Sequence, residues 1–303
     1  EGRWEPDGGM FVEADCNIAS GEALVRQFVH GQRFFKEEFG VDNEILWLPD
    51  VFGYSAALPQ ILQKCGIPYF MTTKISWNEF NKMPYDTFEW EGIDGSRVLT
   101  HFVPTRDYNK AAVEGGTETE HFTTYNGYIN PSQMKGAWAR YSQKYLNEEV
   151  LCSFGFGDGG GGPRKDMLEH QRRLAKEFFH VLDKHVTGKK YLPTWVGELY
   201  LEYHRGTYTS MARNKKFNRK AEFAYQNEEM YAMLDAQTAG GAYPEKELHE
   251  GWEVILRNQF HDILPGSSIK EVYDDSKAEY EGIFAENKAL TDATLAHIAA
   301  GVK

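Results

Sequence analysis

The sequence has few cysteines, and their arrangement limits the kind of protein it encodes. Cys16, Cys65 and Cys152 lie far apart, and no two of them have the CxxC spacing of a metal or redox site. An odd number of scattered cysteines argues against the disulfide framework of small secreted domains. The cysteine content therefore favours a reducing compartment, and we expect a cytoplasmic protein.

Long apolar runs and blocks of positive charge are missing as well. No run of about 18 apolar residues occurs in the 303 residues, so no membrane-spanning helix is predicted. The chain has 33 basic and 45 acidic residues, a net charge of −12, without the lysine or arginine cluster that neutralises phosphates. We expect neither a membrane nor a nucleic acid as partner, whereas assembly into a homo-oligomer stays open.

The N-terminus lacks the features of a natural protein start. It reads Glu-Gly-Arg-Trp-Glu-Pro, with no initiator methionine and no basic stretch followed by an apolar one. We therefore predict that the chain begins inside a longer protein and that any targeting signal lies outside it.

The residue patterns divide the chain into two predicted domains. Within 1–204, short apolar or β-branched runs alternate with amphipathic stretches, which indicates an α/β domain around a parallel sheet. Within 205–303, helix-forming residues dominate, Gly-Gly and Pro-Gly pairs interrupt them, and no strand pattern occurs. The second domain is therefore predicted to be a bundle of three helices.

Several elements of the first domain are predicted individually. The runs 44–48 and 69–73 predict strands, and 56–65 between them predicts a helix, which together make a βαβ unit. The Asp94-Gly95 pair is a hairpin turn signal, so the runs on either side of it predict an antiparallel pair. Further strands are predicted at 10–13 and 150–154, and further helices at 20–39, 131–146 and 163–184.

The first segment that suggests chemistry is 46–54, Leu-Trp-Leu-Pro-Asp-Val-Phe-Gly-Tyr. Asp50 stands where an apolar strand gives way to a loop, which is where active sites of α/β proteins lie. Trp47, Phe52 and Tyr54 have flat faces that suit sugar rings, although they are also ordinary core residues. Asp50 is either a catalytic carboxylate or a cap of the following segment.

A second segment, 154–163, contains a formal GxGxxG between a predicted strand and a helix. A dinucleotide-binding oxidoreductase is one interpretation. Against it, Asp158 would place negative charge inside a phosphate cradle, and Pro163 removes an N–H from the helix start. The acidic residue expected about 20 positions further on is also missing at a strand end. We favour the interpretation that the glycines let a ligand approach the backbone closely and that Asp158 points at this ligand. An alternative is that Asp158 is only a turn residue.

A third segment, 257–268, is predicted to be a helix that ends at Pro265, with His261 and Asp262 in its last turn. His261 suits a metal ligand, or else it is a partner of the helix dipole. Two further stretches, 101–109 and 203–210, mix aromatic and hydrogen-bonding side chains as a polyol site requires.

Four of these motifs, in order, resemble one family. LWLPDVFGYS, GFGDGGGGP, YHRGTYTS and NQFHDILPGSS are similar to segments of the family 38 α-mannosidases, closest to their cytosolic and bacterial branch. The resemblance runs over nearly the whole chain. It implies a distorted, deacetylase-like β/α barrel followed by the helical bundle. It also implies an enzyme that hydrolyses terminal α-D-mannosyl linkages of oligosaccharides with retention of configuration.

The resemblance also implies roles for single residues. Asp50 matches the nucleophile, which is also a zinc ligand, and His261 matches another ligand of Zn²⁺. Asp158 matches the general acid/base, so the chain would supply the two carboxyl groups that a retaining glycosidase needs. Three positions match contacts to the sugar: Phe52, Tyr108 and Asp262.

One departure from the family is large. The family takes two more zinc ligands from a His-x-Asp motif, and none of the ten histidines here has an aspartate two residues later. Two ligands do not fill a four-coordinate site, so we expect this chain alone to bind zinc poorly. A carbohydrate-binding fragment without turnover is therefore an alternative, and a metal-dependent deacetylase on a similar barrel is another.

Overall fold

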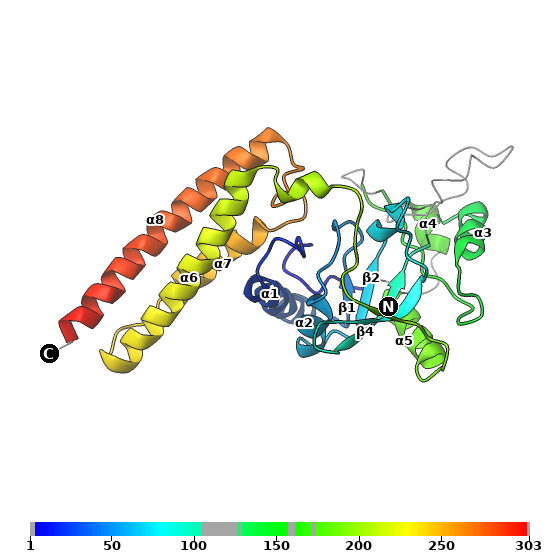
Figure 1. Ribbon diagram of the computed structural model, residues 1–303, viewed down its shortest axis with the longest axis horizontal. Coiled ribbons are helices and arrows are strands. Elements are labelled where there is room, and N and C mark those ends of the chain that lie inside the picture. The colour runs from blue at the N-terminus through cyan, green and yellow to red at the C-terminus, as the bar shows by residue number, and fades with distance from the viewer. Residues whose placement is uncertain (1–3, 105–126, 128, 157–160, 171–173, 302–303) are drawn as a thin grey trace. The chain divides into compact units, whose positions relative to one another are not determined.

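The computed structural model describes residues 4–104, 127, 129–156, 161–170 and 174–301 (Figure 1). The chain divides into two compact units. The first contains residues 1–16 and 28–205, and the second contains 17–27 and 206–303. Because each unit has its own core, each is described by itself.

The first unit is built on a five-stranded mixed sheet with the order β1-β2-β4-β3-β5. β1 pairs with β2 and β2 pairs with β4 in parallel, whereas β3 and β4 are antiparallel. β5 runs parallel to β3. The strands are β1 (Ile45–Trp47), β2 (Tyr69–Thr72), β3 (Thr87–Glu91), β4 (Arg97–Phe102) and β5 (Thr194–Val196).

The predicted βαβ unit is confirmed. Helix α2 (Leu58–Lys64) connects the parallel strands β1 and β2, with Ile45 opposite Tyr69 in register. Pro59 stands in the first turn of α2, where its missing N–H costs nothing. Gly66, with φ +76°, ends the helix in a left-handed conformation that glycine adopts without strain.

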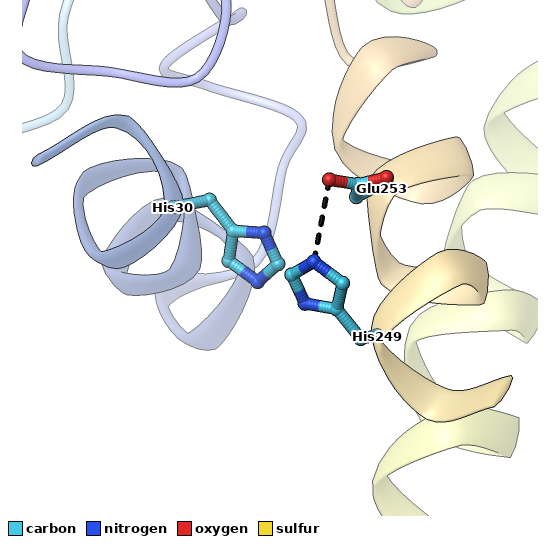
Figure 2. A group of neighbouring side chains, drawn as sticks. All are labelled: His30, His249 and Glu253. Atoms are coloured by element: carbon cyan, nitrogen blue, oxygen red, sulfur yellow. Dashed lines mark ion pairs between the residues drawn. The ribbon is translucent and has the colours of Figure 1, made fainter. Parts of the chain in front are cut away.

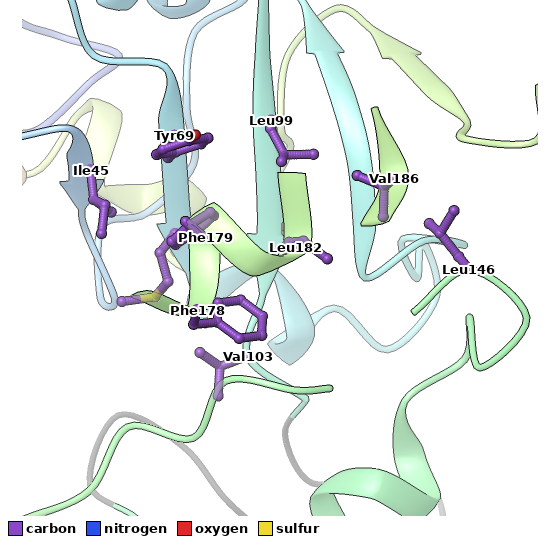
Figure 3. Close-up of a cluster of buried hydrophobic side chains, with 10 residues drawn as sticks. Ile45, Tyr69, Leu99, Val103, Leu146, Phe178, Phe179, Leu182 and Val186 are labelled. Atoms are coloured by element: carbon purple, nitrogen blue, oxygen red, sulfur yellow. The ribbon is translucent and has the colours of Figure 1, made fainter. Parts of the chain in front are cut away.

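One face of this sheet is covered by α5 (Ala175–Val186). Phe178, Phe179 and Leu182 of α5 pack on Tyr69 and other apolar side chains of the central strands (Figure 3). The Tyr69 ring stacks on that of Phe179, with centroids 5.1 Å apart. Along β2 the side chains alternate, so Phe70 points to the opposite face and packs on Trp90. Both faces are therefore buried, as is usual where parallel strands form the centre of a sheet.

The predicted hairpin is present, but other predictions for this unit were wrong. Residues 10–13 and 150–154 form no strand: the first are bends and irregular backbone, and in the second Phe154 makes only an isolated bridge with Gly127. The single helix predicted at 163–184 is two helices, α4 (Lys165–His170) and α5. Strand β5 was not predicted. The remaining helix of this part is α3 (Pro131–Arg140), which ends six residues before its predicted end.

Helix α1 (Gly21–Phe39) contributes residues to both units, since the division falls between residues 27 and 28. The second unit otherwise consists of α6 (Ala212–Thr238), α7 (Glu245–Arg257) and α8 (Lys270–Gly301), which pack on one another (Figure 1). Buried Trp252 of α7 contacts Tyr225 of α6, with ring centroids 6.2 Å apart. In the described part of the chain, no helix is both long and apolar enough to cross a membrane.

Candidate functional site

Asp50 lies just beyond the carboxyl end of β1, as the sequence predicted. The Leu48 N–H donates to the Met71 carbonyl of β2, which continues the pairing of the strands by one residue. The Thr73 hydroxyl then donates to the Pro49 carbonyl over 2.7 Å. These bonds fix the two segments that leave β1 and β2, so Asp50 stands at the carboxyl edge of the sheet beside the residues that follow β2.

Lys74 forms an ion pair with Asp50 at this edge of the sheet. Its Nζ lies 2.6 Å from Asp50 Oδ1, and its side chain is only 6% exposed. Lys74 begins the 3₁₀ turn η1 (Lys74–Trp77) directly after β2. A hydrogen bond between an ammonium and a carboxylate is short and directional. The arrangement thus holds the Asp50 carboxylate in one orientation at the sheet edge.

Two aromatic rings line the Lys74 side chain. Its Nζ lies 4.4 Å from the centroid of the Trp77 ring and 5.2 Å from that of Phe52. Phe52 in turn packs against the tilted ring of His204, with ring centroids 4.3 Å apart. His204 has a positive φ of 64°, which is uncommon for a residue other than glycine. The segments 50–54 and 199–204 therefore meet beside Asp50.

The other two aromatics of the first motif belong to the core. Trp47 packs against the cluster beneath α5. Tyr54 is fully buried, and its hydroxyl donates to the Leu48 carbonyl and pairs with the Thr72 hydroxyl. Burial raises the pKa of Tyr54 well above its ordinary value. Of the three aromatics in the motif, Phe52 is the one that stands beside the Asp50–Lys74 pair.

His261 and Asp262 belong to the second unit, but not to a helix end. Helix α7 ends at Arg257, and the two residues follow in turns, so the prediction of a helix up to Pro265 was wrong. The His261 side chain is buried, and its ring packs on Phe260 with centroids 4.2 Å apart. The Asp262 carboxylate accepts a hydrogen bond from the Ser267 hydroxyl over 2.8 Å. Internal contacts thus hold this turn in shape.

Two predicted site residues, Asp158 and Tyr108, lie outside the described residues. Lys74, by contrast, was not among the predicted site residues. A signal was available, because the polar stretch Thr72-Thr73-Lys74 follows an apolar strand in the same way that Asp50 does. Residues after neighbouring parallel strands meet at one edge of a sheet, which would have brought the two together.

The predicted metal-binding side chains make up only part of a metal site. The resemblance assigns two ligands, Asp50 and His261, where a closed zinc site has four. Asp50 Oδ1 already accepts a hydrogen bond from Lys74. Over the described ranges, no three ligand atoms from histidine, cysteine or acidic side chains of one unit lie close enough together to hold an ion. The described residues of either unit therefore hold no complete metal centre.

Another pair of metal-binding residue types lies one turn apart on α7 (Figure 2). His249 Nε2 is 3.4 Å from Glu253 Oε1, and the two side chains are 41% and 39% exposed. The third side chain drawn, His30, belongs to α1 in the first unit. Ion pairs between such exposed side chains contribute little to stability. We therefore assign the pair on α7 no role in the site.

Comparison with known families decides what the chain is. Residues 1–198 match the family of glycosyl hydrolases family 38, N-terminal domain. The chain belongs to glycosyl hydrolase family 38. Residues 202–298 of this family 38 chain match the alpha mannosidase middle domain. The family indicated by the four sequence motifs is thereby confirmed.

Relatives of this family 38 chain are longer proteins. It is 42% identical to Alpha-mannosidase 2C1 of Homo sapiens over 314 residues, which cover 99% of the chain and 28% of that protein. It is 39% identical to Alpha-mannosidase of Saccharomyces cerevisiae over 310 residues, which cover 95% of the chain and 27% of that protein. The chain therefore spans less than a third of the length of these relatives.

A solved structure supports the fold of this family 38 chain. The crystal structure of an alpha-mannosidase from Enterococcus faecalis V583 matches 97% of the chain and 34% of that protein, with a TM-score of 0.74. The two sequences are 19% identical, so the likeness concerns the fold alone. It confirms the predicted combination of a mixed α/β sheet with helices.

Proposed function

We propose that the chain is the catalytic region of a retaining α-mannosidase that removes terminal α-D-mannosyl residues from oligosaccharides. The observation that carries the proposal is the Asp50 carboxylate, held by Lys74 at the carboxyl edge of the sheet in a family 38 chain. Relatives named alpha-mannosidase support the substrate class. Mannose-containing oligosaccharides are then the partners of this chain.

The reaction follows from two carboxyl groups. Asp50 attacks the anomeric carbon while the glycosidic bond breaks and its oxygen takes a proton from the Asp158 carboxyl. Water then attacks the same carbon, gives its proton to Asp158 and frees Asp50, so the configuration is retained. Lys74 orients the attacking carboxylate through its hydrogen bond to Oδ1. Phe52, Tyr108 and Asp262 contact the mannosyl unit.

The proposal includes a divalent metal, taken as zinc, with Asp50 and His261 as two of its ligands. Bound there, the metal would supply positive charge and orient sugar hydroxyls. We assign no ligands beyond these two, since the described residues of either unit offer no group of three. We also propose a cytoplasmic location, since all three cysteines are free.

The architecture of the whole enzyme extends the two units. We propose that the sheet of the first unit is part of a distorted, deacetylase-like β/α barrel that forms the catalytic domain over 1–204. The helices of the second unit would then be a three-helix middle domain over 205–303. The matches to the family 38 N-terminal and middle domains support this division.

Hydrolysis of an aryl α-mannoside in the presence of zinc tests the proposed function. We expect release of the phenol, with α-mannose as the first sugar product because the configuration is retained. A carbohydrate-binding fragment would bind mannose without releasing phenol. Release of β-mannose first would contradict the double displacement.

Replacing Lys74 by methionine is expected to lower kcat by about 10- to 100-fold, because a hydrogen bond to a charged group contributes about 1.5–3 kcal/mol. KM should change less, since Lys74 holds the attacking group rather than the sugar. Steady-state kinetics on an aryl α-mannoside measure both constants. Lys74→Arg keeps the charge and should lose less activity, so equal losses in the two variants would contradict the role of the charge.

A further inference from the structure

A turn beside the proposed site displays a single aromatic side chain. Phe80 lies three positions after Trp77, the last residue of η1. Its side chain is 89% exposed, which makes it the most exposed large apolar residue in the described ranges. Single exposed apolar residues are common on protein surfaces. The way in which the backbone of this turn is held, however, sets it apart from an ordinary loop.

The Glu202 carboxylate binds three consecutive backbone N–H groups of this turn. The N–H groups of Glu79, Phe80 and Asn81 all donate to it, the first two over 2.7 and 3.0 Å. The Asn81 side-chain amide donates to the same carboxylate over 2.8 Å. Desolvation opposes ionisation, but the backbone donors outweigh it and lower the pKa of Glu202. Successive N–H groups around one anion fix the backbone conformation of a turn.

Buried Asn78 joins the same turn to the segment that reaches the site. Its side-chain amide donates to the Tyr200 carbonyl over 2.7 Å, and its Oδ1 accepts the Glu202 N–H over 2.8 Å. One residue earlier in the chain, Leu199 exchanges two backbone hydrogen bonds with Tyr54, four residues after Asp50. The turn 78–81 is thus tied to the same loops that surround Asp50.

The distance from Asp50 follows from the chain itself. Lys74 contacts Asp50, and a 3₁₀ turn rises about 2 Å per residue, so Trp77 is about 6 Å further along. Three more residues add at most about 10 Å, which places the Phe80 backbone within about 16 Å of that of Lys74. Phe80 therefore lies on the segment that follows the carboxyl end of β2, the same edge of the sheet at which Asp50 stands, and at most about 16 Å along the backbone from Lys74.

We propose that Phe80 is a stacking platform for a second sugar ring of the oligosaccharide whose terminal mannosyl unit is held at Asp50. The apolar face of a pyranose matches the face of an aromatic ring, and a platform that is fixed in advance loses little entropy on binding. Glu202 is then a positioning residue, because it holds the turn. The inference rests on the proposed function and adds a preference for oligosaccharides over simple mannosides.

Isothermal titration calorimetry of the full chain with mannotriose and with methyl α-mannoside tests the platform without requiring turnover. Phe80→Ala is expected to weaken mannotriose binding about tenfold and to leave methyl α-mannoside binding unchanged. Phe80→Trp keeps a ring and should bind mannotriose as the wild type does. Glu202→Ala should change the affinities in the same direction as Phe80→Ala.

A matched control is Ile93→Ala, which removes another exposed apolar side chain, 70% exposed, at the hairpin between β3 and β4. It should leave both affinities unchanged, and circular dichroism checks that every variant is folded. Equal mannotriose affinity in Phe80→Ala and wild type, or equal loss of both ligands, would overturn the platform and leave the proposed function standing. A wild-type chain that binds neither sugar would contradict both.

Discussion

Replacing Asp50 by asparagine is expected to abolish hydrolysis of α-mannosides while leaving the fold intact. An amide does not attack an anomeric carbon, so kcat should fall by on the order of 10⁴-fold, the scale found when one catalytic carboxylate of a hydrolase is removed. The amide oxygen still accepts a hydrogen bond from Lys74, which lies 2.6 Å from the carboxylate in the wild type. The amide carries no charge to balance the buried Lys74 ammonium, so the thermal unfolding midpoint should fall while the variant stays folded.

A control separates this effect from a general loss of charge. Asp42→Asn removes a carboxylate that is paired with Lys36 and whose side chain is 77% exposed, in the same unit. This variant should keep wild-type kinetics with an aryl α-mannoside. If Asp50→Asn retains a large part of the wild-type kcat, the nucleophile is a different residue.

Acid is expected to destabilise the first unit through His101. This residue of β4 is fully buried, its Nδ1 lies 2.9 Å from the Thr87 hydroxyl, and its Nε2 accepts a hydrogen bond from the Leu151 N–H. Burial lowers the pKa of His101 to about 3. Protonation would put an N–H on Nε2 facing the Leu151 N–H, so two donors would oppose each other. The buried surroundings would also not solvate the positive charge.

The sign and size of the effect follow from the two pKa values. The unfolded chain has a histidine pKa of about 6.5, so between pH 6.5 and 3 it binds a proton that the folded chain does not. The contribution of His101 is fully present above pH 6.5 and is lost as the pH falls. The free energy of unfolding should drop by about 2 kcal/mol at pH 5 and by about 4 kcal/mol near pH 3.

Urea unfolding at a series of pH values, followed by circular dichroism, measures this dependence. His101→Gln stays neutral, so its stability should depend less on pH between 7 and 4 than that of the wild type. His185→Gln replaces an exposed histidine of α5 and should keep the wild-type dependence. Parallel curves for wild type and His101→Gln would show that another group causes the acid sensitivity.

The parts of the fold that the sequence predicted are those with strong local patterns. Strands β1 and β2 are apolar runs with a clear helix between them, and the β3–β4 hairpin has the Asp94-Gly95 turn. Strand β5 was missed because it is short, its side chains are largely exposed, and its pairing with β3 joins residues about 100 positions apart. Such pairing leaves no local signal.

Helix ends were harder to predict for a similar reason. The sequence 257–265 continues the helical pattern of α7, but the helix ends at Arg257. The Asn258 side chain donates to the Val254 carbonyl over 2.9 Å and to Glu279 of α8 over 2.6 Å. The Val254 carbonyl also accepts the Asn258 N–H, so the side chain adds a second bond at the helix end, and its partner on α8 is not visible from the local sequence.

The residues of the candidate site also differ in whether the local sequence could predict them. Asp50 was found because an aspartate after an apolar strand is a recognisable local pattern, and the structure places it at the sheet edge together with Phe52. The buried Lys74 and the Glu202-bound turn depend on segments that are distant in sequence, and only the fold brings them together. The roles of Asp158, Tyr108, His261 and Asp262 stay predictions.

Covalent trapping tests the central claim, that Asp50 is the nucleophile of a retaining α-mannosidase, most directly. In a 2-fluoro-mannoside the fluorine slows both steps, and an activated leaving group keeps the first step faster than the second, so a retaining enzyme accumulates the mannosyl-enzyme ester. After incubation with zinc, proteolysis and mass spectrometry should find the fluoromannosyl adduct on the peptide that contains Asp50, and none in Asp50→Asn. An adduct on another carboxylate of an active chain, or turnover without any adduct, would contradict the claim.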